Sequence, residues 1–482
     1  MSNVVQIRDP VHNFIQLREE EAKLISTPLF QRLRGIRQLA MANLVYPGAM
    51  HTRFGHSLGV CHVAGLLANR LGLSAEQSEL VRLAALLHDL GHGPFSHVSE
   101  YALDRYADRS TLKPDQKREK IHELITAHLI CNDPEVVRIV GQERCDKIVR
   151  LLSEGHGPRA LRAIVSGPLD ADKQDYLLRD SYFCGVTYGL FDIHQLHRSL
   201  LLFGPDHDKE LMIEPDGIHA VEQYVLAKYY LTTNVYRHRV RLITDRMIVR
   251  AIELGIDVDE LKPLRRLYGF DNTARFVENY ANWDDARFLH AFGQPSRKPS
   301  LCQQLLQRLR ERQLLKLVFS DQIRRFKGSV RENIARLGDA DGVAVRRRLE
   351  QMIAKAIAKQ VGHTIEPHFV VVHAFEIKSA RVSSRNDEAG ILVARPPKPR
   401  SFEQESTLFR SIRARYSDAF VEVYAPVTWD SLTARAKLRA GLAQPIRALL
   451  ESECEPPRKE PEHGPVRLRT ARPAGRGRRN KG

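Results

Sequence analysis

Three short segments rich in histidine and aspartate lie far apart along this chain, and they restrict its fold more than any other feature. The segments are His51–Ser57, His88–His97 and Asp170–Tyr176. Imidazole and carboxylate groups suit Zn, Mn and Fe, and carboxylate oxygens also suit Mg. If the segments share one ion, elements distant in sequence must pack around it, with coordination positions left open for water and substrate.

The pair His88-Asp89 stands at the centre of this pattern. Adjacent residues do not share one helical face, but at a helix end their side chains can diverge around a single ion. Gly91 and Gly93 permit a tight turn directly after the pair. A lone His-Asp pair is usually a core or surface feature, because dipeptides are common. Here four histidines fall within 42 residues, which favours a metal site: His56, His88, His92 and His97.

Residues 1–290 show mostly helical patterns. Ser74–Gln77 is a capping box, and apolar residues at helical spacing follow it. The segment 54–71 places His56 among apolar residues of one helical face. The segments 303–318 and 343–360 have the pattern of basic amphipathic helices, which favours packing helices with solvated charged faces.

The pattern changes after Gly362. Short β-branched runs predict strands at 369–372, 391–393 and 420–424, and Pro396–Pro399 predicts a loop between them. We therefore expect a core over 1–290, a helical extension over 291–362, a smaller α+β region over 363–455 and a disordered tail over 456–482.

The positive charge of the chain is concentrated in this tail. The chain carries a formal net charge of +16, and residues 456–482 hold nine Lys/Arg against two Glu. Such a segment predicts nucleic-acid binding through phosphates. The alternative is a solubilising end with no partner.

The remaining composition is that of a globular protein. With 482 residues we expect two or three packed units. No apolar run reaches the roughly 18 residues of a membrane span, and the N-terminus lacks the pattern of a secretion signal. The six cysteines are widely spaced without a CxxC pair. A reducing cytoplasm fits this usage better than a disulfide framework does.

At these motifs the sequence resembles the HD-domain superfamily, and within it the deoxynucleoside triphosphate triphosphohydrolases. The similarity is closest to the SAM- and HD-domain branch and its bacterial relatives. It begins at Arg8–His12, continues through Thr27–Arg34 and Tyr46–Ala49, and includes the three histidine and aspartate segments. It reaches about residue 250 and covers roughly half of the chain. The resemblance implies a mostly α fold, with an HD helical core whose motif region spans 50–180.

The resemblance also implies a role for each matching residue. The implied metal ligands are His56, His88, Asp89 and Asp172. The implied catalytic residues are His97, Glu100 and His122. The implied substrate-binding residues are Gln38, Leu39, Arg53, Lys173, Tyr176, Asp180, Lys228 and Tyr236. The spacing agrees independently, because Lys173, Tyr176 and Asp180 fall at i, i+3 and i+7 on one helical face.

Two positions depart from the pattern of these relatives. Where relatives activated by a guanine nucleotide have a carboxylate before the Thr-Pro motif, this chain has Ser26, although Gln31 and Arg34 are present. An allosteric site would therefore be altered or absent. A phosphate-binding arginine of the relatives is replaced by Lys228, which keeps the charge but not the forked geometry.

The function implied by the resemblance is hydrolysis of a dNTP to a deoxynucleoside and inorganic triphosphate, as in a dGTPase. The cofactor would be a divalent metal ion, namely Mn, Mg, Fe or Zn. The resemblance further implies a cytoplasmic homo-oligomer, with a tetramer as the expected state. An HD phosphodiesterase or nuclease acting on nucleic acid is the alternative enzyme. A nucleic-acid-binding protein with a relict site is the alternative without catalysis, which the intact ligand set disfavours.

Overall fold

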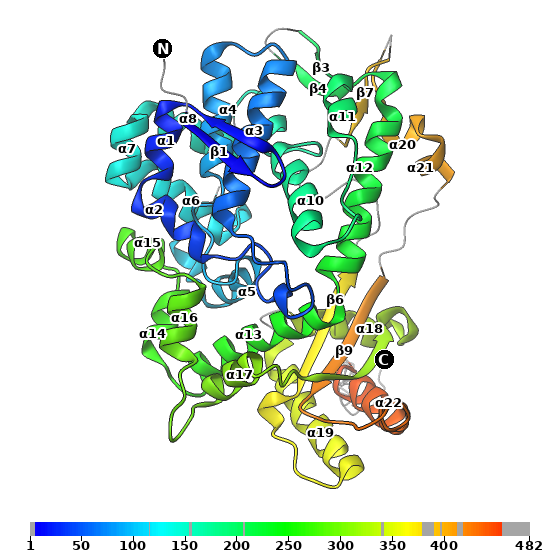
Figure 1. Cartoon of the computed structure of the whole chain (residues 1–482). Coiled ribbons are helices and arrows are strands. Elements are labelled where there is room, and N and C mark those ends of the chain that lie inside the picture. The colour runs from blue at the N-terminus through cyan, green and yellow to red at the C-terminus, as the bar shows by residue number, and fades with distance from the viewer. Residues whose placement is uncertain are drawn as a thin grey trace, which may run out of the picture.

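A computed structural model shows the chain as a helical core joined to a smaller α+β unit (Figure 1). The structure describes residues 5–114, 116–153, 157–205, 208–338, 342–377, 390–395, 398–411 and 418–455. The tail over 456–482, predicted to be disordered and to bind nucleic acid, lies outside the described residues. Of the predicted loop at Pro396–Pro399, only the second half is described.

The core is built from seventeen described helices in chain order. They are α1 (Glu19–Ile25), α2 (Pro28–Gln31), α3 (Arg53–Arg70), α4 (Ala75–Leu87), α5 (His97–Tyr106), α6 (Ile121–Asn132), α7 (Pro134–Val140), α8 (Gln142–Leu152), α9 (Arg159–Val165), α10 (Ala171–Cys184), α11 (Ile193–Ser199), α12 (Ile218–Leu231), α13 (Arg239–Asp257), α14 (Lys262–Tyr268), α15 (Ala274–Tyr280), α16 (Asp285–Phe292) and α17 (Leu301–Arg310). No helix among the described residues is long and apolar enough to cross a membrane.

Helix α3 occupies the centre of this core. It packs against α4 and α10, and Val60, Val63 and Leu67 on it are fully buried. The predicted capping box is confirmed at the start of α4, where the Ser74 hydroxyl accepts from the Gln77 amide (3.2 Å). The central position of α3 explains why a polar residue on it needs partners inside the protein.

An N-terminal hairpin, which the sequence patterns did not reveal, covers one end of α10. Strands β1 (Val5–Asp9) and β2 (Asn13–Leu17) pair antiparallel. Asp9 accepts hydrogen bonds from the amides of Val11 and His12 in the turn (both 2.9 Å). Its other oxygen accepts from Arg179 of α10 (2.9 Å). The hairpin is therefore fastened to the helix that carries Asp172.

The smaller unit is organised around a three-stranded antiparallel sheet with β9 in the middle. Its strands are β5 (Lys316–Gln322), β6 (Val371–Ile377) and β9 (Asp418–Ala425). Helices α18 (Gly328–Ala335), α19 (Val343–Val361) and α22 (Leu432–Glu453) accompany it, as the lower part of Figure 1 shows. Residues of α19 and α22 share a separate apolar core with the strands, including Ile353, Ile446 and Val423.

A second sheet joins the two parts of the chain. Strands β3 (Leu200–Phe203) and β4 (Glu210–Ile213) pair antiparallel, β4 pairs parallel with β7 (Leu392–Val393), and β7 pairs with β8 (Arg400–Ser401). The short helices α20 (Phe402–Glu405) and α21 (Thr407–Ser411) follow. The strands predicted at 369–372, 391–393 and 420–424 correspond to β6, β7 and β9.

The segment 291–362 differs from the helical extension that we expected. The helix predicted over 303–318 ends at Arg310, and β5 begins at Lys316. Leu317 and Phe319 pair with β9, a strand about a hundred residues later in the chain. Such long-range pairing is invisible to local periodicity, because the apolar run fits both a helix and a strand. The helix predicted over 343–360 is present as α19.

A buried histidine between α10 and α11 gives the fold a pH dependence. His197 Nε2 lies 2.7 Å from Gln174 Oε1. Burial, with repulsion from neighbouring histidines, lowers the pKa of His197 to about 4 from 6.5. The unfolded chain therefore binds a proton here below pH 6.5 while the folded chain does not, so stability falls as the pH drops from 6.5 toward 4.

We predict that His197→Gln flattens the fall of Tm between pH 6.5 and 4, because the variant has no group to protonate at this position. The measurement is thermal unfolding across that pH range. His219→Gln, at an exposed histidine of α12, is the control and should retain the slope of the parent chain. A His197→Gln slope equal to that of the parent would contradict the assignment.

Candidate active site

The first metal-ligand candidate, His56, lies one turn into α3 and is completely buried. Its Nδ1 lies 2.8 Å from Asp175 Oδ2, and its Nε2 lies 2.9 Å from Asp172 Oδ1. A carboxylate on Nδ1 fixes the ring orientation and leaves Nε2 as the ligand atom. Helix α10 therefore supplies both the residue that orients His56 and a second candidate ligand.

The tight turn after α4 positions His88 and Asp89. His88 caps the C-terminus of the helix and donates from Nδ1 to the Ala85 carbonyl (2.8 Å), which leaves Nε2 as an acceptor. The Gly91 amide donates to Thr126 Oγ1 of α6 (2.9 Å). A Cβ atom on Gly91 would lie 2.1 Å from the His122 carbonyl, so only glycine allows this close approach.

The four predicted ligands converge on one point. His88 Nε2 lies 3.2 Å from Asp89 Oδ1 and 3.8 Å from Asp172 Oδ1. His56 Nε2 lies 3.7 Å from Asp89 Oδ2. His56, His88 and Asp172 can together hold an ion, since their ligand atoms lie within 4.8 Å of one another. His88 Nε2 is buried without a hydrogen-bond partner in the described structure. The residues therefore fit a divalent cation with mixed nitrogen and oxygen ligands.

Arg53 reaches the same cluster. Its guanidinium donates to Asp89 Oδ2 (2.6 Å) and to Ser96 Oγ (2.9 Å). Its Nη2 lies 3.2 Å from His97 Nε2. Arg53 thus lies between the metal-ligand cluster and the predicted catalytic histidine, and its two terminal nitrogens contact Asp89 and His97.

The predicted catalytic residues surround one carboxylate oxygen at the start of α5. Glu100 Oε1 lies 2.6 Å from His97 Nδ1 and 3.5 Å from Nδ1 of both His92 and His122. Burial opposes ionisation of Glu100, but these histidines hold its pKa well below its usual range. Burial lowers the pKa of His122 to about 3, helped by the adjacent His92. Glu100 is therefore an anion that orients His97, while His122 stays neutral.

His92 belongs to this cluster although it was given no role in the sequence analysis. Its ring stacks on that of His122, with centroids 4.4 Å apart. Burial, followed by repulsion from Arg53, lowers the pKa of His92 to about 4. The close histidine spacing after Asp89 was the signal that could have identified it.

Asp180 and Tyr236, two of the predicted substrate-binding residues, contact each other. The Tyr236 hydroxyl donates to Asp180 Oδ2 (2.6 Å), and His51 Nε2 lies 2.7 Å from Asp180 Oδ1. Tyr236 ends η6 (Thr232–Tyr236), a π-helical turn between α12 and α13. Such turns frequently occur at functional sites. His51 is a further residue that contacts Asp180, and its place in the first histidine segment was its signal.

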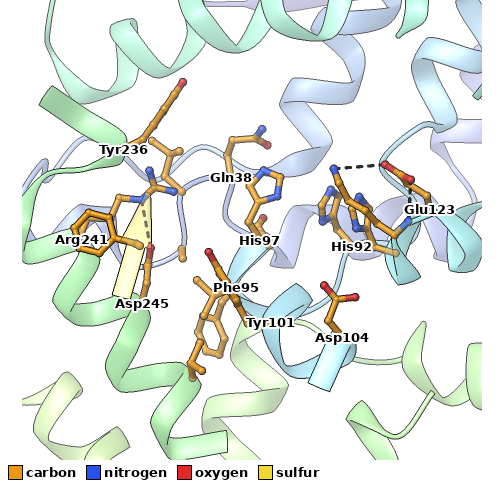
Figure 2. A pocket seen from close by; sticks show the side chains of 18 of the residues that line it. Gln38, His92, Phe95, His97, Tyr101, Asp104, Glu123, Tyr236, Arg241 and Asp245 are labelled. Carbon is orange, nitrogen blue, oxygen red and sulfur yellow. Dashed lines mark hydrogen bonds and ion pairs between the residues drawn. The ribbon is translucent and has the colours of Figure 1, made fainter. Parts of the chain in front are cut away.

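Most predicted substrate-binding residues line one large cavity, and one does not. The cavity has a volume of about 1300 Å³ and includes the predicted residues Gln38, Leu39, Arg53, Lys173, Tyr176, Asp180 and Tyr236. Figure 2 shows Gln38, His97 and Tyr236 around it. Lys173 Nζ donates to Asp170 Oδ2 (2.6 Å) and to the Gly167 carbonyl (2.9 Å). Lys228, on α12, is not among the lining residues.

Comparison with known proteins identifies the family of this chain. The sequence matches the HD domain over residues 53–180 and the HD associated region over residues 191–436. The uncharacterized protein YwfO of Bacillus subtilis is 32% identical, over 64% of this chain and 71% of its own length.

The chain belongs to the HD-domain family.

Other relatives extend the comparison. The deoxynucleoside triphosphate triphosphohydrolase SAMHD1 of Homo sapiens is 28% identical, over 65% of this chain and 54% of its own length. The matched region is thus about half of the human protein. A phosphohydrolase structure from Bacteroides thetaiotaomicron has a TM-score of 0.67 and 23% identity, covering 88% of this chain and all of that chain. That likeness shows the HD fold alone.

Ser26, Gln31 and Arg34, which the sequence analysis compared with a guanine-binding site, lie near one another between the end of α1 and the residues just after α2. Ser26 is exposed at the C-terminus of α1. Gln31 donates to the Ile25 carbonyl (2.7 Å), and Arg34 donates to Gln31 (2.8 Å) while it stacks over Phe54. The altered or absent allosteric site, which Ser26 suggested, stays a prediction.

Asp175 is a positioning residue of the HD site that the sequence analysis did not assign. It is fully buried and contacts His56, Arg179 and His12, whose Nε2 lies 2.7 Å from Asp175 Oδ1. Burial opposes its ionisation, but Arg179 and the two histidines hold its pKa well below its usual range. Its position three residues after Asp172 placed it on the same predicted helix, but only tertiary packing shows that it contacts His56.

We predict that Asp175→Asn lowers metal affinity about 10- to 100-fold, because His56 loses the carboxylate that orients it. The measurement is a metal titration followed by calorimetry, with circular dichroism to confirm folding. Asp146→Asn, at an exposed aspartate of α8, should bind metal as the parent chain does. Equal affinities for the two variants would refute the positioning role.

Proposed function

We propose that this protein is a metal-dependent phosphohydrolase that converts a dNTP and water into a deoxynucleoside and inorganic triphosphate. The observation that carries the proposal is the opposition, across one cavity, of a metal-ligand cluster and the Asp180–Tyr236 pair. The Asp180 carboxylate can accept a hydrogen bond from the 3′-hydroxyl of deoxyribose, and the Tyr236 ring can pack against its 2′ carbon. The SAMHD1 relatives are named as deoxynucleoside triphosphate triphosphohydrolases, which supports the same substrate class.

A divalent cation held by His56, His88, Asp89 and Asp172 would supply a Lewis acid for an α-phosphate oxygen of the substrate. The protein's own residues perform the other tasks. Glu100 binds Nδ1 of His97 and keeps the opposite nitrogen directed toward Arg53. We assign to His97 Nε2 the proton that the leaving 5′-oxygen receives. Arg53 and Lys173 offset the charge of the departing triphosphate.

The remaining expectations from the resemblance are part of this proposal. They are a dGTPase-like specificity, a role for Lys228 near the phosphates, and a homo-oligomer, with a tetramer as the expected state. The cytoplasmic location stays a prediction. The tail over 456–482 keeps its predicted nucleic-acid binding as a separate property, testable by truncation after Glu455.

We predict that Asp89→Asn loses the bound metal and hydrolyses dNTPs at least about 100-fold more slowly, because it removes a ligand and the partner of Arg53. The assay incubates the chain with Mn²⁺ and each of the four dNTPs and separates nucleosides from triphosphate by chromatography. Asp104→Asn, at another cavity aspartate, is the control and should retain the metal. Full metal content and normal turnover in Asp89→Asn would exclude the proposed centre.

We predict that the parent chain cleaves dNTPs at least about tenfold faster than rNTPs, because the Tyr236 ring leaves no room for a 2′-hydroxyl. Tyr236→Ala should narrow this ratio through faster rNTP cleavage, as measured by kcat/KM for dATP and ATP. Tyr230→Ala, at an exposed tyrosine of α12, is the control. Comparable parent rates for dATP and ATP would favour the phosphodiesterase alternative instead.

A further inference from the structure

The cavity extends well beyond the proposed catalytic centre. Its volume of about 1300 Å³ exceeds the 300 to 1,000 Å³ of an ordinary small-molecule pocket. Part of this space lies where α13 of the core faces β6 and α19 of the smaller unit. We call this part the rear lobe and define it by Tyr101, Arg237, Arg246, Arg346 and His373. Arg246 lies two turns along α13 from its first residue, Arg239, a distance of about 10 Å.

Most arginines at the junction of the two units are neutralised by carboxylates. Arg250 of α13 donates to Glu350 of α19, and Arg346 donates to Glu253 (2.9 Å). Arg241 lies 3.7 Å from Asp245, an ion pair visible in Figure 2. The two pairs between α13 and α19 hold the smaller unit against α13, and all three pairs contribute little net charge to the cavity.

Two arginines of the rear lobe are exceptions. Within the described chain, neither Arg237 nor Arg246 has a carboxylate within 4.0 Å. Arg237 donates to the Glu376 carbonyl (2.7 Å), but its Nη1 is buried with no hydrogen-bond partner. Arg246 stacks over the ring of Tyr101, with its Cζ 4.5 Å from the centroid. Both arginines are half-buried, so each cation has lost part of its hydration without gaining a carboxylate at ion-pair distance, which is a frequent sign of a binding site.

His373 completes the lobe from the centre of β6. It is 6% exposed, and its Nδ1 has no hydrogen-bond partner in the described structure. Burial, reinforced by repulsion from Arg246, Arg346 and Arg237, holds its pKa well below its usual range. The ring is therefore neutral and surrounded by three guanidinium groups. One imidazole N–H and two forked cations are the donors that phosphate oxygens require.

We propose that the rear lobe is a second polyphosphate-binding site, in which Arg237, Arg246 and His373 hold the phosphates of a ligand distinct from the substrate at the metal centre. The ligand is either inorganic triphosphate or the triphosphate group of a second nucleotide. Because α13 lines one side of the lobe and β6 and α19 line the other, its occupant contacts both the core and the smaller unit. The site rests on geometry, and only the choice of a triphosphate follows from the proposed function.

The test measures binding of inorganic triphosphate to the full chain without metal, by calorimetry, so that the probe does not chelate a cation. The parent chain should bind two equivalents. Arg246→Gln and Arg53→Ala should each retain one, because they remove different sites, and Arg246→Gln should weaken the lost site at least tenfold. Arg287→Ala removes an exposed arginine that also stacks on an aromatic ring, and it should retain both.

Two results would overturn the proposal. The first is that the parent chain binds one equivalent of inorganic triphosphate and that only Arg53→Ala abolishes this binding. The second is that Arg246→Gln binds inorganic triphosphate as the parent chain does. Thermal unfolding checks that each variant is folded, and Arg246→Lys, which keeps the charge but not the fork, should bind with intermediate affinity. A titration of Arg53→Ala with dGTP distinguishes inorganic triphosphate from a nucleotide as the ligand, since only a nucleotide-binding site would bind dGTP. Failure of dNTP hydrolysis with intact triphosphate binding would reject the proposed function and leave this site standing.

Discussion

A single buried carboxylate, that of Asp175, holds together the parts from which the centre of this protein is made. It contacts His56 of α3, His12 of the N-terminal hairpin and Arg179 one turn further along α10. A charge with no exposure survives inside a protein only when several partners surround it. Here those partners come from three separate segments, so the same contacts that stabilise the anion also fix the orientation of a metal-ligand candidate.

The sequence was most informative where function requires a particular residue. The His88–His97 segment predicted a metal site, and the structure brings His56, His88, Asp89 and Asp172 together as that prediction requires. Helix α3, the capping box of α4 and the later strands were also predictable, because each has a local pattern. The roles assigned to individual residues stay predictions until they are measured.

Other features depended on contacts that no local pattern records. The local apolar pattern predicts a helix where strand β5 lies, because the partner strand β9 is about a hundred residues later in the chain. His51, His92 and Asp175 received no role, since spacing alone does not show which neighbour a side chain meets. Lys228, to which the resemblance gave a phosphate-binding role, is not among the residues that line the described cavity, and its role stays a prediction. In each case tertiary packing decided the outcome.

The shared wall of the cavity has an evolutionary consequence. One side of the rear lobe belongs to α13 and the other to β6 and α19, whose apolar core is separate. The smaller unit is therefore not a module that can be exchanged or deleted while the remainder keeps both walls of the cavity. Substitutions on either side must remain compatible with the opposite wall, so the two units are constrained to diverge together.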